Sequence, residues 1–294
     1  LQVGFSGNGT LAIDAGGTVI NSLGRVGYNK GSIGTVTVSG DGSTWMNASG
    51  LFIGEAGSGT LAISDGGTVS SGSSYVGHLA ASTGEVTVSG VGAMWNNTSE
   101  LWVGSSGSGT LTITVGGTVS NSVGRVGYYK GSTGAVTVAG AGSTWTNSGE
   151  LSIGYSGDGA LTVTAGATVA NVAGYVGYLS GSTGEVTVSG AGSTWVSNGD
   201  LTVGHYGQGN LALADGGTVA AANVSVNSQS LLAIDVSNNS RLTVGGGTGT
   251  ITNNGTIRLI AGAGPAAGAG HTPILAGTFA GSGMYQAVGG TWDA

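Results

Sequence analysis

Residues 101–119 read LWVGSSGSGTLTITVGGTV, and this pattern returns along the chain at a fixed spacing. Its opening, a Leu followed two residues later by Val or Ile and then by Gly, recurs every 50 residues, at Leu1, Leu51, Leu101, Leu151 and Leu201. A constant period of this kind is typical of proteins built from stacked repeats. Apolar and small polar residues alternate within the stretch, a period of two that favours strands with one buried face.

Each 50-residue unit divides into two similar halves. Residues 10–13 (TLAI) are matched by residues 35–38 (TVTV) and again by residues 60–63 (TLAI). Each half has three short apolar segments separated by glycine-rich corners, and its commonest residues are poor helix formers. We therefore predict an all-β fold, a right-handed parallel β-helix (β-solenoid) with about 25 residues and three short strands per coil. About 11 coils at roughly 4.8 Å each would give a rod on the order of 50 Å long.

The third strand of each predicted coil places one apolar residue in the core, and this residue alternates in size. The column reads Val19, Trp45, Val69, Trp95, Val119, Trp145, Val169, Trp195 and Val219. Val beside Trp fills a column that Trp on Trp would overpack. We therefore predict a core column of Trp45, Trp95, Trp145 and Trp195, and we interpret its alternation as the reason why the full period spans two coils.

A polar column follows two residues after each Val or Trp of the third strand. Its members are Asn21, Asn47, Ser71, Asn97, Asn121, Asn147 and Asn171. Stacked amides can hydrogen-bond from coil to coil as an Asn ladder. The preference of Asn for turns explains the same column equally well.

The regularity of the repeat divides the chain in two. Residues 1–222 are predicted to form regular double coils, and residues 223–294 less regular C-terminal coils with strands near 231–236, 241–244, 256–260 and 284–288. Residues 262–270, rich in Gly and Ala and including Pro265, are predicted to form a loop that leaves the rod.

The composition argues against several classes of function. The chain of 294 residues has 64 Gly, 6 Lys or Arg, 13 Asp or Glu, a net charge of −7 and no Cys. The few basic residues are scattered, so we predict no nucleic-acid partner. No apolar run is long enough to cross a bilayer, so we predict no membrane insertion by this segment.

The residues that could carry chemistry do not converge. Glu100, Glu150 and Asp200 share one column two coils apart, and we expect a solvated edge there and not a catalytic pair. Neither a calcium-binding nonapeptide nor a phosphate-binding loop occurs. We therefore predict that the protein is not an enzyme and has no catalytic, metal-binding or cofactor-binding residues. The three histidines, His78, His205 and His271, also have no plausible partners for a catalytic triad or a metal site at neighbouring positions of the repeat.

One outward column beside the first strand carries large planar or cationic side chains. This candidate surface contact strip consists of Arg25, Phe52, Tyr75, Trp102, Arg125 and Tyr175. Exposed aromatic and Arg side chains favour sugars or protein partners. The alternative is that these side chains stack on one another as a cross-strand ladder.

Threonines on the outer face of the second strand resemble the flat arrays of ice-binding solenoids. They occur at residues 35 and 37, at 110, 112 and 114, and at 162 and 164. Ala12, Ala62, Glu85, Glu185 and Ala212 interrupt the array, and the high β-propensity of Thr is the simpler explanation.

The repeat units VGxSGxGTLxIxxGGTV and GSTGxVTVSGxGSTWxNSG resemble the β-helical passenger repeats of bacterial autotransporters. They are similar also to repeats of other large bacterial surface proteins, some of which carry a C-terminal sorting signal. Residues 253–259 and 285–294 look like the segment that follows such arrays. The resemblance implies secretion to the bacterial cell surface and roles in adhesion, aggregation or biofilm formation.

Two functions follow as expectations. The first is a non-enzymatic extracellular structural rod that assembles head to tail into a filament or forms part of a long surface fibre, because the repeat runs in register to both ends of the sequence. The alternative at the ends is an excerpt of a longer repeat protein. The second function is an adhesin that recognises glycans or cell surfaces. The expected partners are therefore other copies of the chain, laterally or head to tail, or a surface glycan or protein.

Overall fold

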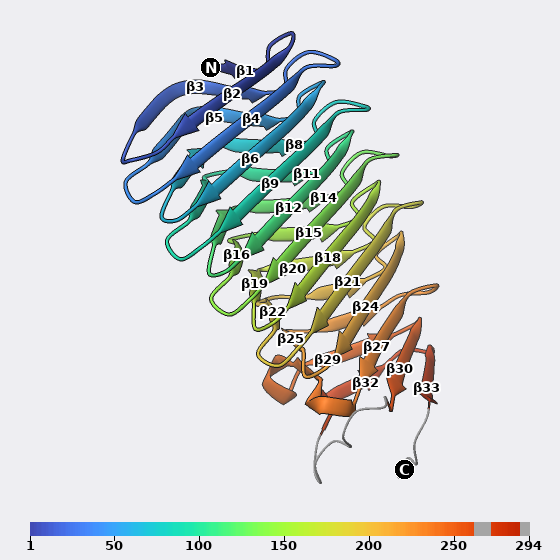
Figure 1. Cartoon of the computed structure of the whole chain (residues 1–294). Helices are drawn as coiled ribbons and strands as arrows, with labels where there is room; N and C mark the ends of the chain where they lie inside the picture. Colours follow the sequence, from blue (N-terminus) through green and yellow to red (C-terminus); the bar gives the residue numbers. More distant parts are fainter. Residues whose placement is uncertain (262–271, 289–294) are drawn as a thin grey trace.

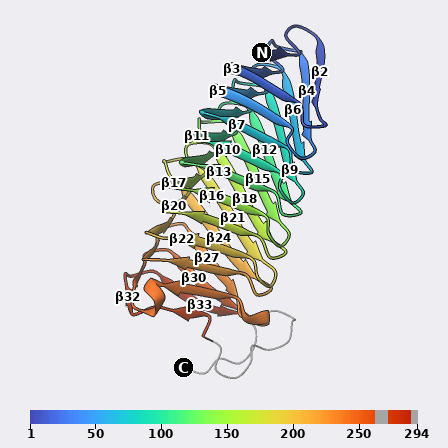
Figure 2. The ribbon, with the colours of Figure 1, turned by 90° about the vertical axis from the view of Figure 1, so that its left-hand side faces the viewer.

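Strands of successive coils run in the same direction and pair with one another. The structure, a computed structural model, describes residues 1–261 and 272–288. In this part of the chain the coils stack into a rod, with the N-terminal coil at one end and the last strands at the other (Figure 1). A view turned by 90° shows the same stack along its side (Figure 2). The prediction of an all-β parallel β-solenoid with about 25 residues per turn and about 11 turns is confirmed.

Two sheets form the walls of the described rod. A 12-stranded sheet takes one strand from each coil. Its strands are β2 (Asn8–Ile13), β4 (Ile33–Ser39), β6 (Ser58–Ser64), β9 (Thr83–Ser89), β12 (Ser108–Thr114), β15 (Thr133–Ala139), β18 (Asp158–Thr164), β21 (Thr183–Ser189), β24 (Gln208–Ala214), β27 (Leu231–Asp235), β30 (Thr256–Ile260) and β33 (Met284–Val288).

The second sheet has 21 strands in the described chain and contains the other two strands of each coil. Its strands are β1 (Gln2–Val3), β3 (Thr18–Val26), β5 (Thr44–Ile53), β7 (Thr68–Ser71), β8 (Ser73–Val76), β10 (Met94–Asn97), β11 (Glu100–Val103), β13 (Thr118–Asn121), β14 (Val123–Val126), β16 (Thr144–Asn147), β17 (Glu150–Ile153), β19 (Thr168–Asn171), β20 (Ala173–Val176), β22 (Thr194–Ser197), β23 (Leu201–Val203), β25 (Thr218–Ala221), β26 (Val224–Val226), β28 (Arg241–Val244), β29 (Thr250–Asn253), β31 (Ile274–Leu275) and β32 (Thr278–Ala280). β3 and β5 each run through both positions, so that the third strand of one coil and the first strand of the next are continuous there.

The residues of the 12-stranded sheet follow a strict register. From β2 to β24 each residue pairs with the residue 25 positions later, as Leu111 does with Val136. The other sheet alternates between a shorter and a longer step, because Val3 pairs with Val26, whereas Val26 pairs with the more distant Ile53. The 50-residue period therefore has a second cause besides the Val/Trp alternation: adjacent coils differ in the length of their corners.

The glycine that follows each first strand makes the turn into the 12-stranded sheet. Gly27 has φ +69°, and a Cβ there would lie 2.1 Å from the carbonyl oxygen of Ser58 in the next coil. Both the left-handed conformation and the close approach of the next coil's backbone require glycine. The same residue recurs at this corner with the same geometry at Gly54, Gly77, Gly104, Gly127, Gly154 and Gly177.

The last coils keep the pairing but lose the regular spacing. The four strands predicted beyond residue 222 are present within one residue of their expected bounds. The sequence did not reveal β26, β29, β31 and β32, nor two short 3-10 turns, η1 (Ser237–Asn239) and η2 (Gly245–Gly247). The predicted loop at residues 262–270, His271 and the final residues 289–294 lie outside the described part of the chain.

The core consists of columns of apolar side chains, each contributed by equivalent positions of successive coils. Its largest fully buried members are Trp45, Trp95, Trp145 and Trp195, each 0% exposed. The Val between two Trp residues is almost as deeply buried, as at Val69 and Val119. Alternation of large and small side chains therefore fills the column at the strand spacing that the sheets impose.

The polar column lies beside the tryptophans, and its amides hydrogen-bond from coil to coil. The indole Nε1 of Trp145 donates to Oδ1 of Asn121 over 2.8 Å, and Nδ2 of Asn121 donates to Oδ1 of Asn147 over 2.6 Å. The same two bonds join Trp45, Asn21 and Asn47. The column is therefore a set of coil-to-coil bonds, which also satisfy the buried indoles.

We call each buried Trp, with the Asn and Gly residues around its indole, a cell of this column. The cell around Trp95 differs from the others. The amide that would accept from Trp95 is replaced by Ser71, and Nε1 of Trp95 has no hydrogen-bond partner among the described residues. Ser74 stands where the other cells have glycine, and both serines donate to Oδ1 of Asn97 over 2.7 and 2.5 Å. A Cβ at the equivalent Gly24 would lie 2.3 Å from an amide oxygen. The cell therefore accommodates either Asn with Gly or Ser with Ser.

We predict that the double substitution Ser71→Asn/Ser74→Gly stabilises the protein, because the introduced amide would accept from the unpaired indole of Trp95. A buried unsatisfied donor costs on the order of 1–3 kcal/mol, so a gain of about 1 kcal/mol is expected. Ser71→Asn alone should be destabilising, because the Ser74 side chain occupies the space that glycine leaves free in the other cells. Chemical denaturation of both variants measures the difference, and equal effects of the single and double changes would contradict the prediction.

Candidate functional site

Two columns of side chains run along the corner that follows the first strand. The first is the predicted contact strip, on the strands of the 21-stranded sheet. The second is the residue directly after each corner glycine, and it reads Phe5, Tyr28, Glu55, His78, Ser105, Tyr128, Tyr155, Tyr178 and His205. The two columns complement each other in size: the corner residue is Glu, His or Ser beside the strip rings Phe52, Tyr75 and Trp102.

Seven rings of the two columns form one continuous series of contacts, which we name the aromatic ladder. Its members come from consecutive coils, and neighbouring ring centroids lie 4.3 to 4.9 Å apart; five of the six contacts are stacked, and Tyr75 meets Trp102 edge-on at 71°. The centroid distance is close to the spacing of hydrogen-bonded strands, so the fold itself brings the rings into contact. The ladder consists of Phe52, Tyr75, Trp102, Tyr128, Tyr155, Tyr178 and His205.

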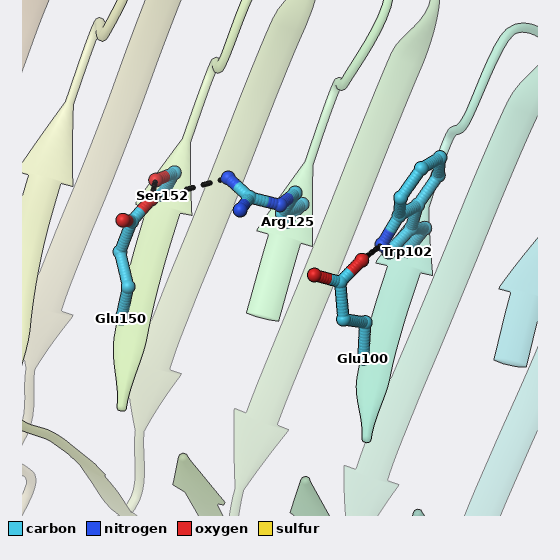
Figure 3. Close-up of polar contacts among 5 residues, drawn as sticks. All are labelled: Glu100, Trp102, Arg125, Glu150 and Ser152. Carbon is cyan, nitrogen blue, oxygen red and sulfur yellow. Dashed lines mark hydrogen bonds and ion pairs between the residues drawn. The ribbon is translucent and has the colours of Figure 1, made fainter. Parts of the chain in front are cut away.

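The ladder crosses from the strip to the corner column between Trp102 and Tyr128. These two rings stack at 4.3 Å with planes 30° apart, and the corner position beside Trp102 is the small Ser105. Nε1 of Trp102 donates to Oε2 of Glu100 over 2.6 Å, which fixes the indole at the crossing (Figure 3). Beyond the crossing Tyr128, Tyr155 and Tyr178 lie nearly parallel, with interplanar angles of 20° and 12°.

Arg125 takes the strip position where the ladder has moved to the corner column. Its guanidinium carbon lies 4.8 Å from the ring centroid of Tyr155 and 5.5 Å from that of Tyr128. Its Nη1 bonds Oε1 of Glu150 over 3.2 Å, and Ser152 donates to the same carboxylate (Figure 3). The charge of Arg125 is therefore held against ring faces and neutralised within the corner.

Arg25 makes the corresponding contacts near the start of the rod. Its guanidinium carbon lies 4.7 Å from the ring centroid of Tyr28, and its Nε is 2.9 Å from Oε2 of Glu55. The Glu55 contact is an ion pair without hydrogen-bond geometry. Desolvation raises the pKa of the Glu55 carboxyl above its ordinary value, although Arg25 acts in the opposite direction.

The residues of the contact strip are less exposed to solvent than the prediction of an exposed strip implies. Arg25, Phe52, Tyr75, Trp102, Arg125 and Tyr175 are all half-buried. Among the six, Phe52 stacks on Tyr75 and Tyr75 meets Trp102 edge-on, so this part of the strip forms the cross-strand ladder that we weighed as the alternative. Whether the strip also binds a partner stays a prediction.

The expectation of a solvated acidic edge is wrong for Glu100 and Glu150. Both carboxylates are half-buried and hydrogen-bonded within the corner, because the indole of Trp102 and the guanidinium of Arg125 lie beside them. Asp200 is exposed, and its carboxylate accepts from Nδ2 of Asn223 over 2.9 Å.

Sequence reasoning missed the exposed aromatic residues that flank the ladder. Tyr129 and Tyr206 are 50% and 71% exposed, and each meets a ladder ring edge-on, at 78° and 74°. It also missed that His78 and His205 pack among these rings. The signal was present, since all four residues lie one or two positions after a corner glycine.

Burial favours the uncharged form of four rings of this corner. Desolvation lowers the pKa of His78 and raises the pKa of Tyr75, Tyr128 and Tyr178. Nδ1 of His78 is buried and has no hydrogen-bond partner among the described residues. A neutral imidazole beside Phe52 and Tyr75 is therefore the stable form in the folded protein.

The outer face of the 12-stranded sheet offers a shallow groove and a row of threonines. The groove has a volume of ≈ 440 Å³ and includes Asp158 and Glu185 on a floor of Gly and Ala. A central column has Thr in five consecutive coils, from Thr87 to Thr187. Glu85 and Glu185 stand in the neighbouring column, as the sequence indicated. Across residues 1–261 and 272–288, no group of three His, Asp or Glu side chains is placed to hold a metal ion.

No protein-family model and no curated protein matches this chain. None of the helical segments in the described residues has the length and apolar character needed to cross a membrane.

We predict that a ladder ring contributes more to stability than an exposed ring of the same type. Tyr155→Ser removes two stacked neighbours and the contact with Arg125, and each aromatic pair is worth about 0.5–1.5 kcal/mol beyond the area buried. A loss of about 2–4 kcal/mol is expected, against less than about 1 kcal/mol for the control Tyr206→Ser. Urea denaturation compares them, and equal losses would show that the stack adds nothing.

We predict also that His78 makes stability fall in mild acid. Its pKa is lowered in the folded state, so the unfolded chain binds the proton more readily. The contribution of the neutral ring is complete above the ordinary value of 6.5 and is lost as the pH falls below it. His78→Tyr, which installs the residue found at positions 28, 128 and 178, should remove this part of the pH dependence. Parallel pH profiles for parent and variant, measured by thermal unfolding between pH 7.5 and 5, would refute the assignment.

Proposed function

We propose that this chain is a non-enzymatic extracellular structural protein, a rigid rod that forms part of a long fibre on the bacterial cell surface. The observation that carries the proposal is the continuity of the stack: the 12-stranded sheet, the core columns and the aromatic ladder all run from coil to coil at one spacing. A structure of this kind resists bending because each deformation would break contacts in every column at once.

The composition supports an extracellular location. The chain has 6% charged residues and its surface is covered by Gly, Ser, Thr and Asn, which is unusual for an intracellular protein. The resemblance of the repeat units to bacterial surface proteins supports the same location. Strands pair in parallel from coil to coil along the described rod, although the last coils lose the regular spacing, so the strands of one rod have the direction needed to pair with those of another, and head-to-tail assembly into a filament is part of the proposal.

A second candidate function is an adhesin that recognises glycans or cell surfaces. Tyr129 and Tyr206 favour it, because their rings stand across the ladder and are half or more exposed. Aromatic faces of this kind stack on sugar rings in many binding sites.

Antibody labelling of intact bacteria that produce the protein tests the location, and electron microscopy of the purified chain tests the shape. The proposal expects label on the surface and straight rods that join into fibres at high concentration. Labelling seen only after the cells are opened, or dispersed globular particles, would overturn it. Binding on a glycan array that Tyr129→Ala/Tyr206→Ala abolishes would favour the adhesin instead.

A further inference from the structure

Alternate coils carry a longer corner between the first strand and the 12-stranded sheet. Four such corners have six residues: 27–32, 77–82, 127–132 and 177–182. The corners between them, such as 104–107 and 154–157, have four. Loops extend beyond the sheet along this edge of the rod (Figure 1). We name the four six-residue corners the projecting loops, and they follow one another at every second coil, about 10 Å apart.

The projecting loops are built to hold their shape. In each, the amide and the hydroxyl of a serine both donate to the carbonyl oxygen three residues earlier, as Ser132 does to Tyr129 over 3.0 and 2.7 Å. The residue before the serine takes the left-handed conformation, at Gly31, Ala81, Gly131 and Gly181. Ordered loops can dock without a large loss of conformational entropy.

The residue that begins the turn is large in three of the projecting loops. Leu79 is 45% and Tyr129 is 50% exposed, and the half-buried Leu179 occupies the same position two coils on. Three of the four-residue corners have small side chains at the equivalent place, Ala56, Ser106 and Ser156, whereas the corner of residues 204–207 has the exposed Tyr206. From Ala56 to Leu179, small and large apolar residues therefore alternate along this edge, coil by coil.

Charge alternates along the same edge with the same period. The basic residues Arg25, Lys30, Arg125 and Lys130 belong to coils with projecting loops, whereas Glu55, Glu100, Glu150 and Asp200 belong to the coils between them. Because Arg25 and Arg125 already pair with Glu55 and Glu150 within one copy, the exposed Lys30 and Lys130 are the basic residues of this group left to meet another copy. Four of the six basic residues of the chain lie on this edge. It is therefore nearly neutral, although the whole chain has a net charge of −7. Repulsion between copies is weakest where these edges meet.

We propose that two copies of this chain pair side by side and antiparallel, with the projecting loops of each seated over the four-residue corners of the other. A two-fold axis between the coil of Ser106 and the coil of Tyr129 produces this match. It places Tyr129 of one copy against Ser106 of the other, Leu79 against Ser156, Leu179 against Ala56, and Tyr206 against the polar Asn29. Because the axis lies between two coils and not on one, each coil with a projecting loop faces a coil with a four-residue corner, and large residues meet small ones.

The same axis brings unlike charges together. The coil of Lys130 lies against the coil of Glu100 in the other copy, and the coil of Lys30 lies against that of Asp200. The alternative axis, one coil further along, would place Leu79 against Tyr206, which is 71% exposed and too large for the gap. The structure therefore favours the first axis over the second. The pairing is a lateral contact that adds to the proposed rod and rests on it for its setting.

Disulfide trapping tests the register, because the chain has no cysteine of its own. Leu79→Cys/Ser156→Cys should form a covalent dimer on mild oxidation, since the two sites are three coils apart within one copy and cannot join there. Leu79→Cys/Tyr206→Cys, which reports the alternative axis, and Leu79→Cys alone should stay monomeric. Covalent dimer from either control in equal yield would overturn the proposed register.

Sedimentation equilibrium tests the pairing without a crosslink. The parent chain should dimerise reversibly, and Leu79→Asn/Tyr129→Asn/Leu179→Asn should weaken dimerisation at least tenfold. Asn29 occupies the same position in the first projecting loop, so the variant should fold, and its thermal unfolding measures this. A parent chain that stays monomeric at millimolar concentration overturns the pairing, while surface labelling of rods would leave the proposed function standing.

Discussion

The backbone hydrogen bonds between coils fix the distance from each residue to its equivalent in the next coil. Because this distance is only about 4.8 Å, the side chain at each position must pack directly against the side chain at the equivalent position of the next coil. Rings in successive coils must therefore touch, face to face or edge to face, which is why centroids of neighbouring ladder rings lie 4.3 to 4.9 Å apart. Charges in such a column must find partners, as Arg125 and Glu150 do.

The side chains of each column therefore pack as pairs of coils, in which a change at one position is matched by a change at its neighbour. Two tryptophans cannot succeed each other in the core at this spacing, and Val separates them. A similar paired change occurs beside the tryptophans. Around Trp95, Ser71 and Ser74 replace the Asn and Gly found at the equivalent positions of the other cells. It occurs again at the corner, where Trp102 is paired with Ser105 and Arg125 with Tyr128. In each case the volume is conserved across two positions and not within one.

Most of the fold could be predicted from the sequence because repetition exposes it. The inward Val, Leu and Ile columns, the tryptophans and the strand positions follow from alternation and from the doubled period. The crossing of the ladder from one column to the other could not, because it depends on which of two neighbouring positions is large in each coil. Nor could the partial burial of Glu100 and Glu150, since a column of carboxylates is interpreted as a solvated edge unless the indole or guanidinium beside it is known to bond to the carboxylate.

The doubled period has consequences inside and outside the rod that need not have coincided. Inside, the Val/Trp alternation requires only that large residues avoid each other. Outside, the corner lengths alternate with the same phase, and with them the size and charge of the exposed residues. A single-coil repeat would present the same surface at every level, and a second copy could slide along it without a preferred position. An edge that alternates large with small and basic with acidic has a favoured shift, because moving by one coil sets Tyr129 against Tyr129 and Leu79 against Leu179 and brings the coils of like charge together. The doubling that lets the core pack is thus the feature that gives the outer edge a register.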